Sequence, residues 1–251
     1  MIGQNTISTN SIFSNENSSI DSFTPDEIKV TSDTEPDTIK KETAIVYCEG
    51  NFAEIDGKTA NGLVRHSEKY EILSIIDSKK SGKDAGEILD GVANGIPIFR
   101  DLGTALANAG KLPDCFIFGI APATGKLSCT ERRLLLRAIT YGMNIVNGLH
   151  EFLNEDPEFV EAASKANVTI RDIRKPRDKK TLRVFNGQIS EVTCPRIAVL
   201  GTDCAIGKRT TATILTNEIN RLGIKAIMIG TGQTGLIQGA RYGLALDAIP
   251  S

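Results

Sequence analysis

The chain has 251 residues, of which 40% are hydrophobic and 24% charged, a composition that fits a soluble globular protein of one or two domains. Its formal net charge is −2, so there is no basic excess for a nucleic-acid partner, and no run of about 18 apolar residues is present to cross a membrane. The N-terminus lacks the features of a secretory or transit signal, and we therefore expect a cytoplasmic protein.

The first part of the chain is rich in Ser, Thr, Asn and Asp and has few apolar residues. Such a segment cannot bury enough apolar surface to offset the entropy lost on ordering. We therefore predict that residues 1–42 form a disordered acidic and polar tail.

Folded sequence is expected to begin at Thr43. Apolar strand patterns occupy residues 43–48, 70–77, 114–120 and 143–149, and helical patterns occupy 88–95, 102–110, 129–142 and 155–167. Strands that alternate with helices indicate a parallel sheet with helices on both faces. We assign residues 43–180 to a Rossmann-like α/β domain.

A basic, turn-rich stretch at 174–192 interrupts this rhythm, and we interpret it as the domain boundary. Beyond it a strand is predicted at 195–201, a helix from about Lys208 to Leu222, and a second strand at 224–230. A complete nucleotide-binding α/β domain needs more strands than these. The sequence therefore predicts a second α/β domain over 193–251 that is incomplete at its C-terminus.

The five cysteines offer no zinc or disulfide pattern, since their number is odd and no CxxC pair occurs. Cys48 and Cys115 lie within apolar runs, which favours buried thiols that act as small hydrophobic side chains. We expect no metal site.

The most informative segment is IAVLGTDCAIGKRTTATILTNEINRLG, in which an apolar strand leads into a glycine turn and a helix follows. Glycines let main-chain amides turn toward an anion, the helix start adds its dipole, and Lys208 supplies a mobile positive charge. This predicts a P-loop that holds the phosphate of a nucleotide or of coenzyme A; the alternative is a glycine turn that only joins strand to helix. The candidate cofactor-binding residues are Gly201, Thr202, Asp203, Cys204, Ala205, Ile206, Gly207, Lys208, Arg209, Thr210 and Thr211.

This loop departs from the standard GxxxxGK[ST] pattern in two ways. Five residues, not four, separate Gly201 from Gly207, and Arg209 stands where a Ser or Thr would meet Mg²⁺. The lengthened form resembles the loop of dethiobiotin synthetase, which has Thr directly after the Lys. The displaced Thr favours phosphate binding over Mg²⁺-dependent hydrolysis of a nucleoside triphosphate.

A second glycine cluster, GTGQTG at 230–235, formally matches GxGxxG. A dinucleotide site needs a following helix, strand and acid about 20 residues further on, which the sequence does not supply. We interpret the cluster as a loop beside the phosphate site, with Gln233 and Thr234 facing the ligand. A purely structural glycine turn is the alternative.

Three other segments offer candidate substrate-binding residues. The segment EIDGKTANGLVRHS brings Thr59 and Arg65 close behind a glycine, where they line a pocket or a solvated loop before a short helix. Lys126 follows a predicted strand end, where ligands gather in open α/β sheets, although ordinary turn chemistry explains it equally. Asp172 and Arg174 would share one face of an extended segment and reach a cleft, or else lie on a solvated surface.

Two residues are candidates for catalysis. His150 is one of only two histidines and follows a predicted strand; histidine is the usual general base near neutral pH, although a lone histidine is often structural. Lys58 follows the glycine turn of the segment EIDGKTANGLVRHS.

Taken together, these segments resemble the D-glutamate N-acetyltransferase-like family, long known only as a domain of unknown function. The matching stretches are EGNFAEIDGKTANGLVRHSEKYEILSIID, GIAPATG, GLHEFL, RDIRKP, GTDCAIGKRTT and GTGQTG, which occur in family order. The resemblance implies a Rossmann-like domain followed by a P-loop NTPase-like domain similar to dethiobiotin synthetase. It also implies that the family continues beyond Asp247, and that the tail is an addition.

The resemblance further implies that the chain transfers an acetyl group from acetyl-CoA to the amine of D-glutamate or a related acidic amino acid. The P-loop would then hold the nucleotide end of coenzyme A, and His150 would take the proton from the amine. Two alternatives stay open: an ATP/Mg²⁺-dependent ligase or kinase resembling dethiobiotin synthetase, and a non-catalytic nucleotide-binding fragment. We expect a small-molecule substrate and no nucleic-acid or membrane partner, and the short C-terminal unit suggests a homo-oligomer.

Overall fold

The computed structural model describes residues 40–122, 125–178, 180, 184–203 and 206–248. Residues 1–39 of the predicted tail lie outside the described part, and its last residue, Glu42, instead begins the first strand. No helix among the described residues is long and apolar enough to cross a membrane.

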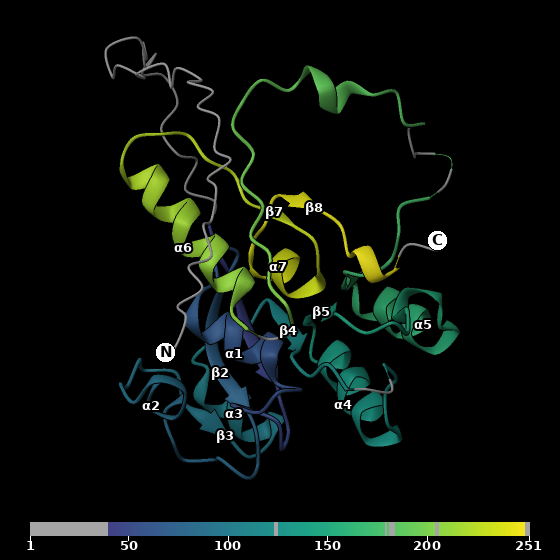
Figure 1. The fold of residues 1–251 in the computed structure, drawn as a ribbon. Helices are drawn as coiled ribbons and strands as arrows, with labels where there is room; N and C mark the ends of the chain where they lie inside the picture. The colour runs from purple at the N-terminus through teal and green to yellow at the C-terminus, as the bar shows by residue number, and fades with distance from the viewer. Residues whose placement is uncertain (1–39, 123–124, 179, 181–183, 204–205, 249–251) are drawn as a thin grey trace, which may run out of the picture. The chain divides into compact units, whose positions relative to one another are not determined.

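A six-stranded, fully parallel sheet organises residues 42–172 (Figure 1). Its strands are β1 (Glu42–Tyr47), β2 (Tyr70–Ile76), β3 (Ile98–Phe99), β4 (Cys115–Phe118), β5 (Asn144–Asn147) and β6 (Ile170–Asp172). Their spatial order is β3-β2-β1-β4-β5-β6, so the direction of winding reverses between β1 and β4. In such sheets, the point of reversal is where a crevice opens at the carboxyl ends of the strands.

The connections between these strands are mostly helical, which confirms the predicted alternation. The helices are α1 (Lys58–Arg65), α2 (Ala85–Asp90), α3 (Leu102–Asn108), α4 (Cys129–Thr140) and α5 (Pro157–Ala166), with a 3₁₀ turn, η2 (Leu153–Glu155), before α5. Local chemistry sets their ends. At the start of α4, the Ser128 hydroxyl accepts a hydrogen bond from the Glu131 amide, and the Glu131 carboxylate accepts one from the Ser128 amide. This reciprocal capping satisfies two amides that would otherwise lack partners.

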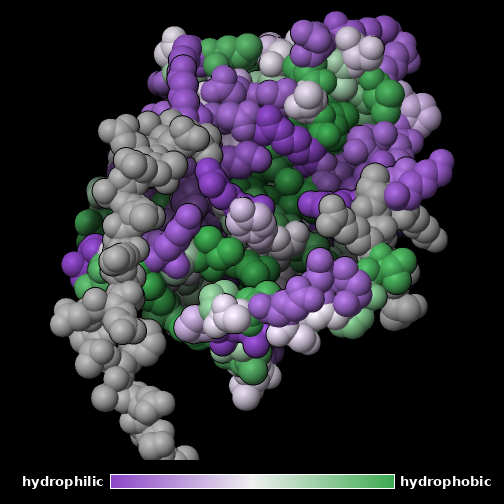
Figure 2. Space-filling view, turned by 90° about the horizontal axis from the view of Figure 1, so that it is seen from above, coloured by the Kyte–Doolittle hydropathy of each residue, from purple (hydrophilic) through white to green (hydrophobic). Residues whose placement is uncertain are grey.

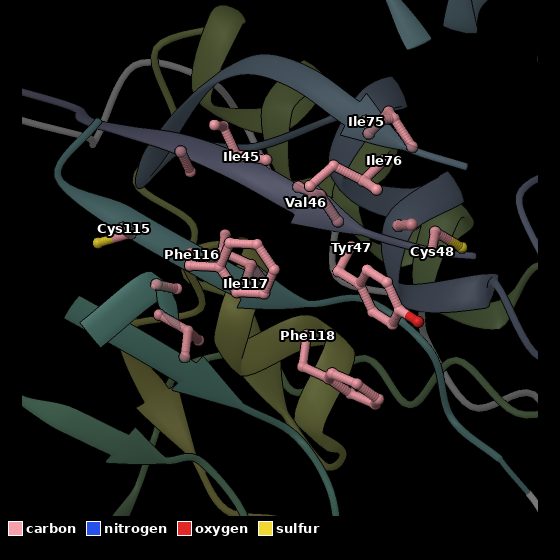
Figure 3. Close-up of a cluster of buried hydrophobic side chains, with 14 of the residues drawn as sticks. Ile45, Val46, Tyr47, Cys48, Ile75, Ile76, Cys115, Phe116, Ile117 and Phe118 are labelled. Atoms are coloured by element: carbon pink, nitrogen blue, oxygen red, sulfur yellow. The ribbon is translucent and has the colours of Figure 1, made fainter. Parts of the chain in front are cut away.

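The core lies around the central strands β1, β2 and β4 (Figure 3). The Tyr47 ring lies 5.5 Å from the Phe118 ring between centroids, and Phe116 is fully buried beside them. Burying each such aromatic or branched side chain stabilises the fold by about 1.5–3 kcal/mol. Cys48 and Cys115 are buried free thiols, as predicted, and burial raises the pKa of Cys115 to about 12.

The later part of the chain contains shorter elements. They are η4 (Gln188–Glu191), α6 (Lys208–Arg221), β7 (Ile229–Gly230), α7 (Gln233–Gln238), β8 (Tyr242–Gly243) and η5 (Leu246–Ala248). Strands β7 and β8 pair in parallel and form a sheet of their own. Many large apolar residues here are exposed, and Figure 2 shows hydrophobic residues at the surface among hydrophilic ones.

Both strands predicted for this later part need correction. Residues 195–201 form no strand, and of 224–230 only Ile229–Gly230 is extended and paired. Ile197 and Leu200 are 67% and 84% exposed. A strand requires a neighbour to take its amides and carbonyls, and among the described residues none pairs with 195–200. The segment is apolar, as a strand would be, but it is not part of a sheet, so the prediction of a strand at 195–201 is wrong.

Three smaller differences have local causes. The helix predicted at 88–95 is found at Ala85–Asp90, because Asp84 caps it through the amides of Gly86 and Glu87 and a left-handed Gly91 ends it. The GTGQTG cluster was expected to be a loop, yet Gln233 and Thr234 begin α7. Strands β3 and β6 were not predicted, since two or three residues are too few to show a period of two.

Candidate functional site

At the point of reversal between β1 and β4, main-chain hydrogen bonds join the loop after β4 to the end of β1 and to the start of α1. The amide of Ala60, in the first turn of α1, donates to the Gly119 carbonyl at 3.2 Å, and the Gly119 amide donates to the Tyr47 carbonyl at 2.8 Å. A Cβ at Gly119 would lie 2.6 Å from Val46 Cγ1, so only glycine allows this approach. In dinucleotide-binding sheets, the first strand-to-helix turn holds the pyrophosphate. Here the loop after β4 lies against that turn.

The predicted P-loop leads directly into α6. Gly207 adopts φ +93 and precedes Lys208, the first residue of the helix, and no side chain of the described residues caps the helix. The Lys208 ammonium donates to the main-chain carbonyl of Asp203, and the side chains of Ile206 and Lys208 lie over Gly201. The loop therefore bends back on itself with its lysine turned inward. Cys204 and Ala205 lie outside the described residues.

The remaining residues of this loop differ in exposure. Thr202, Asp203, Thr210 and Thr211 are exposed. Arg209 is half-buried and turns away toward α1: a Cβ at Gly62 would lie 2.7 Å from its Nη2 atom. Burial, and secondly the nearby charge of Arg65, lower the pKa of Arg209. The residue that replaces the usual Ser or Thr thus packs on a different element of the fold.

Helix α7 brings predicted residues from distant segments together. The hydroxyls of Thr59 and Thr234 lie 3.0 Å apart, which joins α1 to α7. Gln233 is buried, and its Cγ atom would lie 3.4 Å from a Cβ at Gly148, in the loop after β5. The pairing of the GTGQTG cluster with the segment that follows β1 was not foreseen from spacing.

The two candidate catalytic residues follow different strands of the sheet. His150 is exposed in the loop after β5, and its ring would contact a Cβ at Gly125, with 3.3 Å to Cδ2. Lys58 is exposed at the first position of α1. Among the described residues, no hydrogen bond or ion pair joins them. Their catalytic roles stay predictions.

The candidate substrate-binding residues are mostly engaged with the protein itself. Asp172 accepts hydrogen bonds from Asn147 Nδ2 at 2.7 Å and from the Asn154 amide at 2.8 Å. Arg174 is buried, donates to the Gly148 carbonyl at 2.7 Å and pairs with Asp247. A substrate at these residues would have to compete with those partners.

Arg65 and Lys126 differ from that pair because both are exposed. Arg65 forms a two-pronged ion pair with Asp90, at 2.6 and 2.9 Å, and also donates to the Leu89 carbonyl. Its charge is thereby balanced at the edge of α2. Lys126 stands in the turn that leads into α4.

Arg65, expected to line either a pocket or a solvated loop, borders a cavity of about 600 Å³, whose other walls the sequence did not reveal. Its walls come from α1, the α2 region, α6 and the end of α7, and they include Gly62, Arg65, His66, Asp90, Arg209 and Gln238. Gln238 is buried, and its Nε2 atom donates to the carbonyls of Gly62 and His66 at 2.6 and 2.8 Å. Sequence reasoning placed Arg65 and Arg209 in separate sites. The one available signal was that Arg209, Thr213 and Asn217 recur every four residues on one face of α6.

Comparison with known proteins relates both halves of the chain to one family. Residues 78–176 match DUF1611_N, described as a domain of unknown function with a Rossmann-like domain, and residues 183–251 match DUF1611_C, described as a P-loop domain. A solved DUF1611 family protein from Anabaena variabilis is 30% identical, with a TM-score of 0.73, and the match covers 84% of this chain and 59% of that one.

Two curated relatives carry the name D-glutamate N-acetyltransferase. The protein of Tritonibacter scottomollicae is 32% identical over 134 residues, which cover 53% of this chain and 38% of the relative. The protein of a Pseudoalteromonas species is 33% identical over 147 residues, which cover 58% and 42%. The chain thus spans about two fifths of the length of these curated relatives. With the Rossmann-like domain and the P-loop domain both matched, and in this order, the chain belongs to the DUF1611 family.

Proposed function

We propose that the chain takes part in acetyl transfer from acetyl-CoA to the amine of D-glutamate or a related acidic amino acid. Two relatives of about one-third identity bear the name of this reaction. Because the chain spans only part of their length, the reaction is a proposal for this chain and not a property carried over from them.

The observation that carries the proposal is the inward-turned Lys208 at an uncapped helix start. Among the described residues, its ammonium contacts a main-chain carbonyl and no carboxylate. A carbonyl holds a lysine in place without neutralising it, so the positive charge stays available to an anion. The first amides of α6 add their dipole at the same point. This arrangement supports binding of a phosphate of coenzyme A.

The reaction itself places few demands on the protein beyond orientation and proton transfer. The ammonium group of the acceptor must lose a proton before its lone pair can attack the thioester carbonyl. The carbon–sulfur bond then breaks, and coenzyme A leaves with the electron pair and takes up a proton. We assign the role of base to His150, because it is exposed in the loop after β5.

One observation favours a second reading, an ATP-dependent ligase or kinase. Thr210 and Thr211 are exposed in the first turn of α6, where a hydroxyl near the phosphates assists Mg²⁺ binding in standard P-loops. The two readings differ in their products, since only the ligase or kinase releases ADP.

The test is a direct assay of the purified chain with acetyl-CoA and either D- or L-glutamate. We expect release of the coenzyme A thiol together with N-acetylglutamate, detected by mass, and loss of at least about tenfold in activity for Lys208→Ala. Lys225→Ala is the matched control, because Lys225 is exposed and lies outside the loop. ADP release from ATP and Mg²⁺ without acetylated product would overturn the acetyltransferase proposal in favour of the ligase.

A further inference from the structure

We infer that the cavity bounded by α1, the α2 region and α6 is the binding site for the amino-acid acceptor, with Arg209 as the counter-ion of its carboxylate. The choice of an amino acid as ligand rests on the proposed function; the site itself rests on the geometry below. The P-loop and this cavity would then hold the two substrates on either side of the start of α6.

The cavity has the size and the chemistry of a small polar-ligand site. It measures about 600 Å³, within the range of roughly 300–1,000 Å³ that is typical of ligand pockets. Its walls carry neutral hydrogen-bonding side chains, among them Asn94, Thr210 and Asn217, in addition to the two arginines. No described residue satisfies the side chains of Thr210 and Asn217, so both can turn to a ligand.

Arg209 is the charge that this wall leaves uncompensated. Arg65 is neutralised at 2.6 Å by Asp90, the one carboxylate among the described residues of the wall. Arg209 is half-buried and, among the described residues, has neither a hydrogen-bond acceptor nor an ion-pair partner. A guanidinium keeps its proton under all ordinary conditions, so a desolvated one without a partner destabilises the fold until an anion binds.

The direction in which the pKa of Arg209 is shifted agrees with an unpaired positive charge at this wall. Burial and then repulsion from Arg65 lower the pKa of Arg209, which is the effect of an environment that disfavours positive charge. A carboxylate in the cavity would offset both causes, because a nearby negative charge favours the charged guanidinium. It would also match the planar fork of the guanidinium, which binds carboxylates through two parallel hydrogen bonds.

Gln238 is a further polar residue of the same wall. Its Nε2 atom is used by the carbonyls of Gly62 and His66, which fixes the orientation of the amide, and its Oε1 atom is buried without a donor. Arg209 and Gln238 both lie against Gly62. The wall therefore combines a free positive charge with the side-chain oxygens of Thr210 and Asn217, a combination that suits the carboxylate and ammonium of an amino acid better than a phosphate.

The test measures binding separately from catalysis. Calorimetric titrations of the whole chain use D-glutamate, glutarate, which lacks the amine, and inorganic phosphate. Arg209→Gln removes the charge, and Gly62→Ala displaces it: the new Cβ would contact the end of the flexible arginine, while alanine is a better helix former than glycine. Arg221→Gln is the control on the same helix, because Arg221 is exposed at the far end of α6.

We expect D-glutamate to bind more tightly than glutarate, and both to lose about tenfold or more in affinity in Arg209→Gln and Gly62→Ala but not in Arg221→Gln. The site would be overturned if neither D-glutamate nor glutarate bound, or if all variants bound them equally. It would also be overturned if phosphate bound more tightly than D-glutamate and depended on Arg209. Acetylation of D-glutamate with an unchanged KM in Arg209→Gln would overturn the site and leave the proposed function standing. If D-glutamate bound in an Arg209-dependent way but was not acetylated, the site would stand and the proposed function would be overturned.

Discussion

Strands β1 and β4 are buried almost along their whole length, whereas the equally apolar segment 195–200 exposes Ile197 by 67% and Leu200 by 84%. The difference lies in neighbours, since β1 pairs on both sides with β2 and β4, and among the described residues nothing pairs with 195–200. An apolar pattern thus indicates that a segment can form a strand. The strand is stable only where neighbouring strands form hydrogen bonds with its backbone.

The largest expected difference between the two regions comes from removing one large side chain from each. Phe116→Ala should destabilise the protein by about 3–5 kcal/mol, because Phe116 is fully buried and the surrounding core cannot close the cavity. Leu200→Ala should change stability by less than about 0.5 kcal/mol, because the side chain already meets water. Urea unfolding of both variants measures the contrast. A Leu200→Ala cost close to that of Phe116→Ala would mean that 195–200 packs as a strand in solution.

Two glycines make the next comparison. Gly119→Ala should cost about 1–3 kcal/mol, since the added Cβ would lie 2.6 Å from Val46 Cγ1 and 2.9 Å from the Tyr47 carbonyl oxygen, both in buried residues of β1. Gly232→Ala should be close to neutral, since nothing lies within 4 Å of the new Cβ and the residue is extended, with φ −155. Thermal melting of the two variants measures the two losses of stability. Equal losses would show that the second region is packed more tightly than its exposed residues suggest.

The ion pair between Glu42 on β1 and Arg171 on β6 ties two non-adjacent strands together, at 2.6 and 2.7 Å. Glu42→Gln should cost about 1–2 kcal/mol at neutral pH, because two charge-assisted hydrogen bonds are weakened. Hydrogen bonding to Arg171 lowers the pKa of Glu42. Its contribution is therefore complete above the unfolded-state pKa of about 4.3 and is lost as the pH falls through the lower folded-state value.

Unfolding experiments across this pH range test the assignment. The wild type should lose stability on acidification more steeply than Glu42→Gln. Parallel acid profiles for the two proteins would show that the pair is not formed in solution.

The smallest effect concerns helix ends. Ser128→Ala should cost about 1 kcal/mol, because α4 loses the hydroxyl that accepts from the Glu131 amide. No described side chain caps the start of helix α6, and Thr211→Ala in its exposed first turn should be nearly neutral in stability. Circular dichroism melting curves compare the two. A larger loss for Thr211→Ala would reveal a capping role that the structure does not show.

Much of the fold was accessible from the sequence. Patterns such as TAIVYC and CTERRLLLRAIT predicted β1 and α4 to within a residue or two, because hydrophobic period and capping residues are local properties. Shorter elements escaped prediction: β3 has two residues and β6 three, too few to show a period, and both are held by pairing with β2 and β5. The bent P-loop and the start of α6 at Lys208 were also foreseen from glycine spacing.

By itself, the sequence determined that the chain alternates strands and helices, that Cys48 and Cys115 are buried, and that a glycine loop ends in a lysine at a helix start. Only the tertiary structure decided that Arg209 leaves that loop for Gly62, and that Gln238 lies beside it with an unused acceptor. The reason is physical. Period, propensity and capping act over a few residues and leave a trace in the local pattern, whereas a contact across nearly 150 residues depends on how packed elements meet and leaves no such trace.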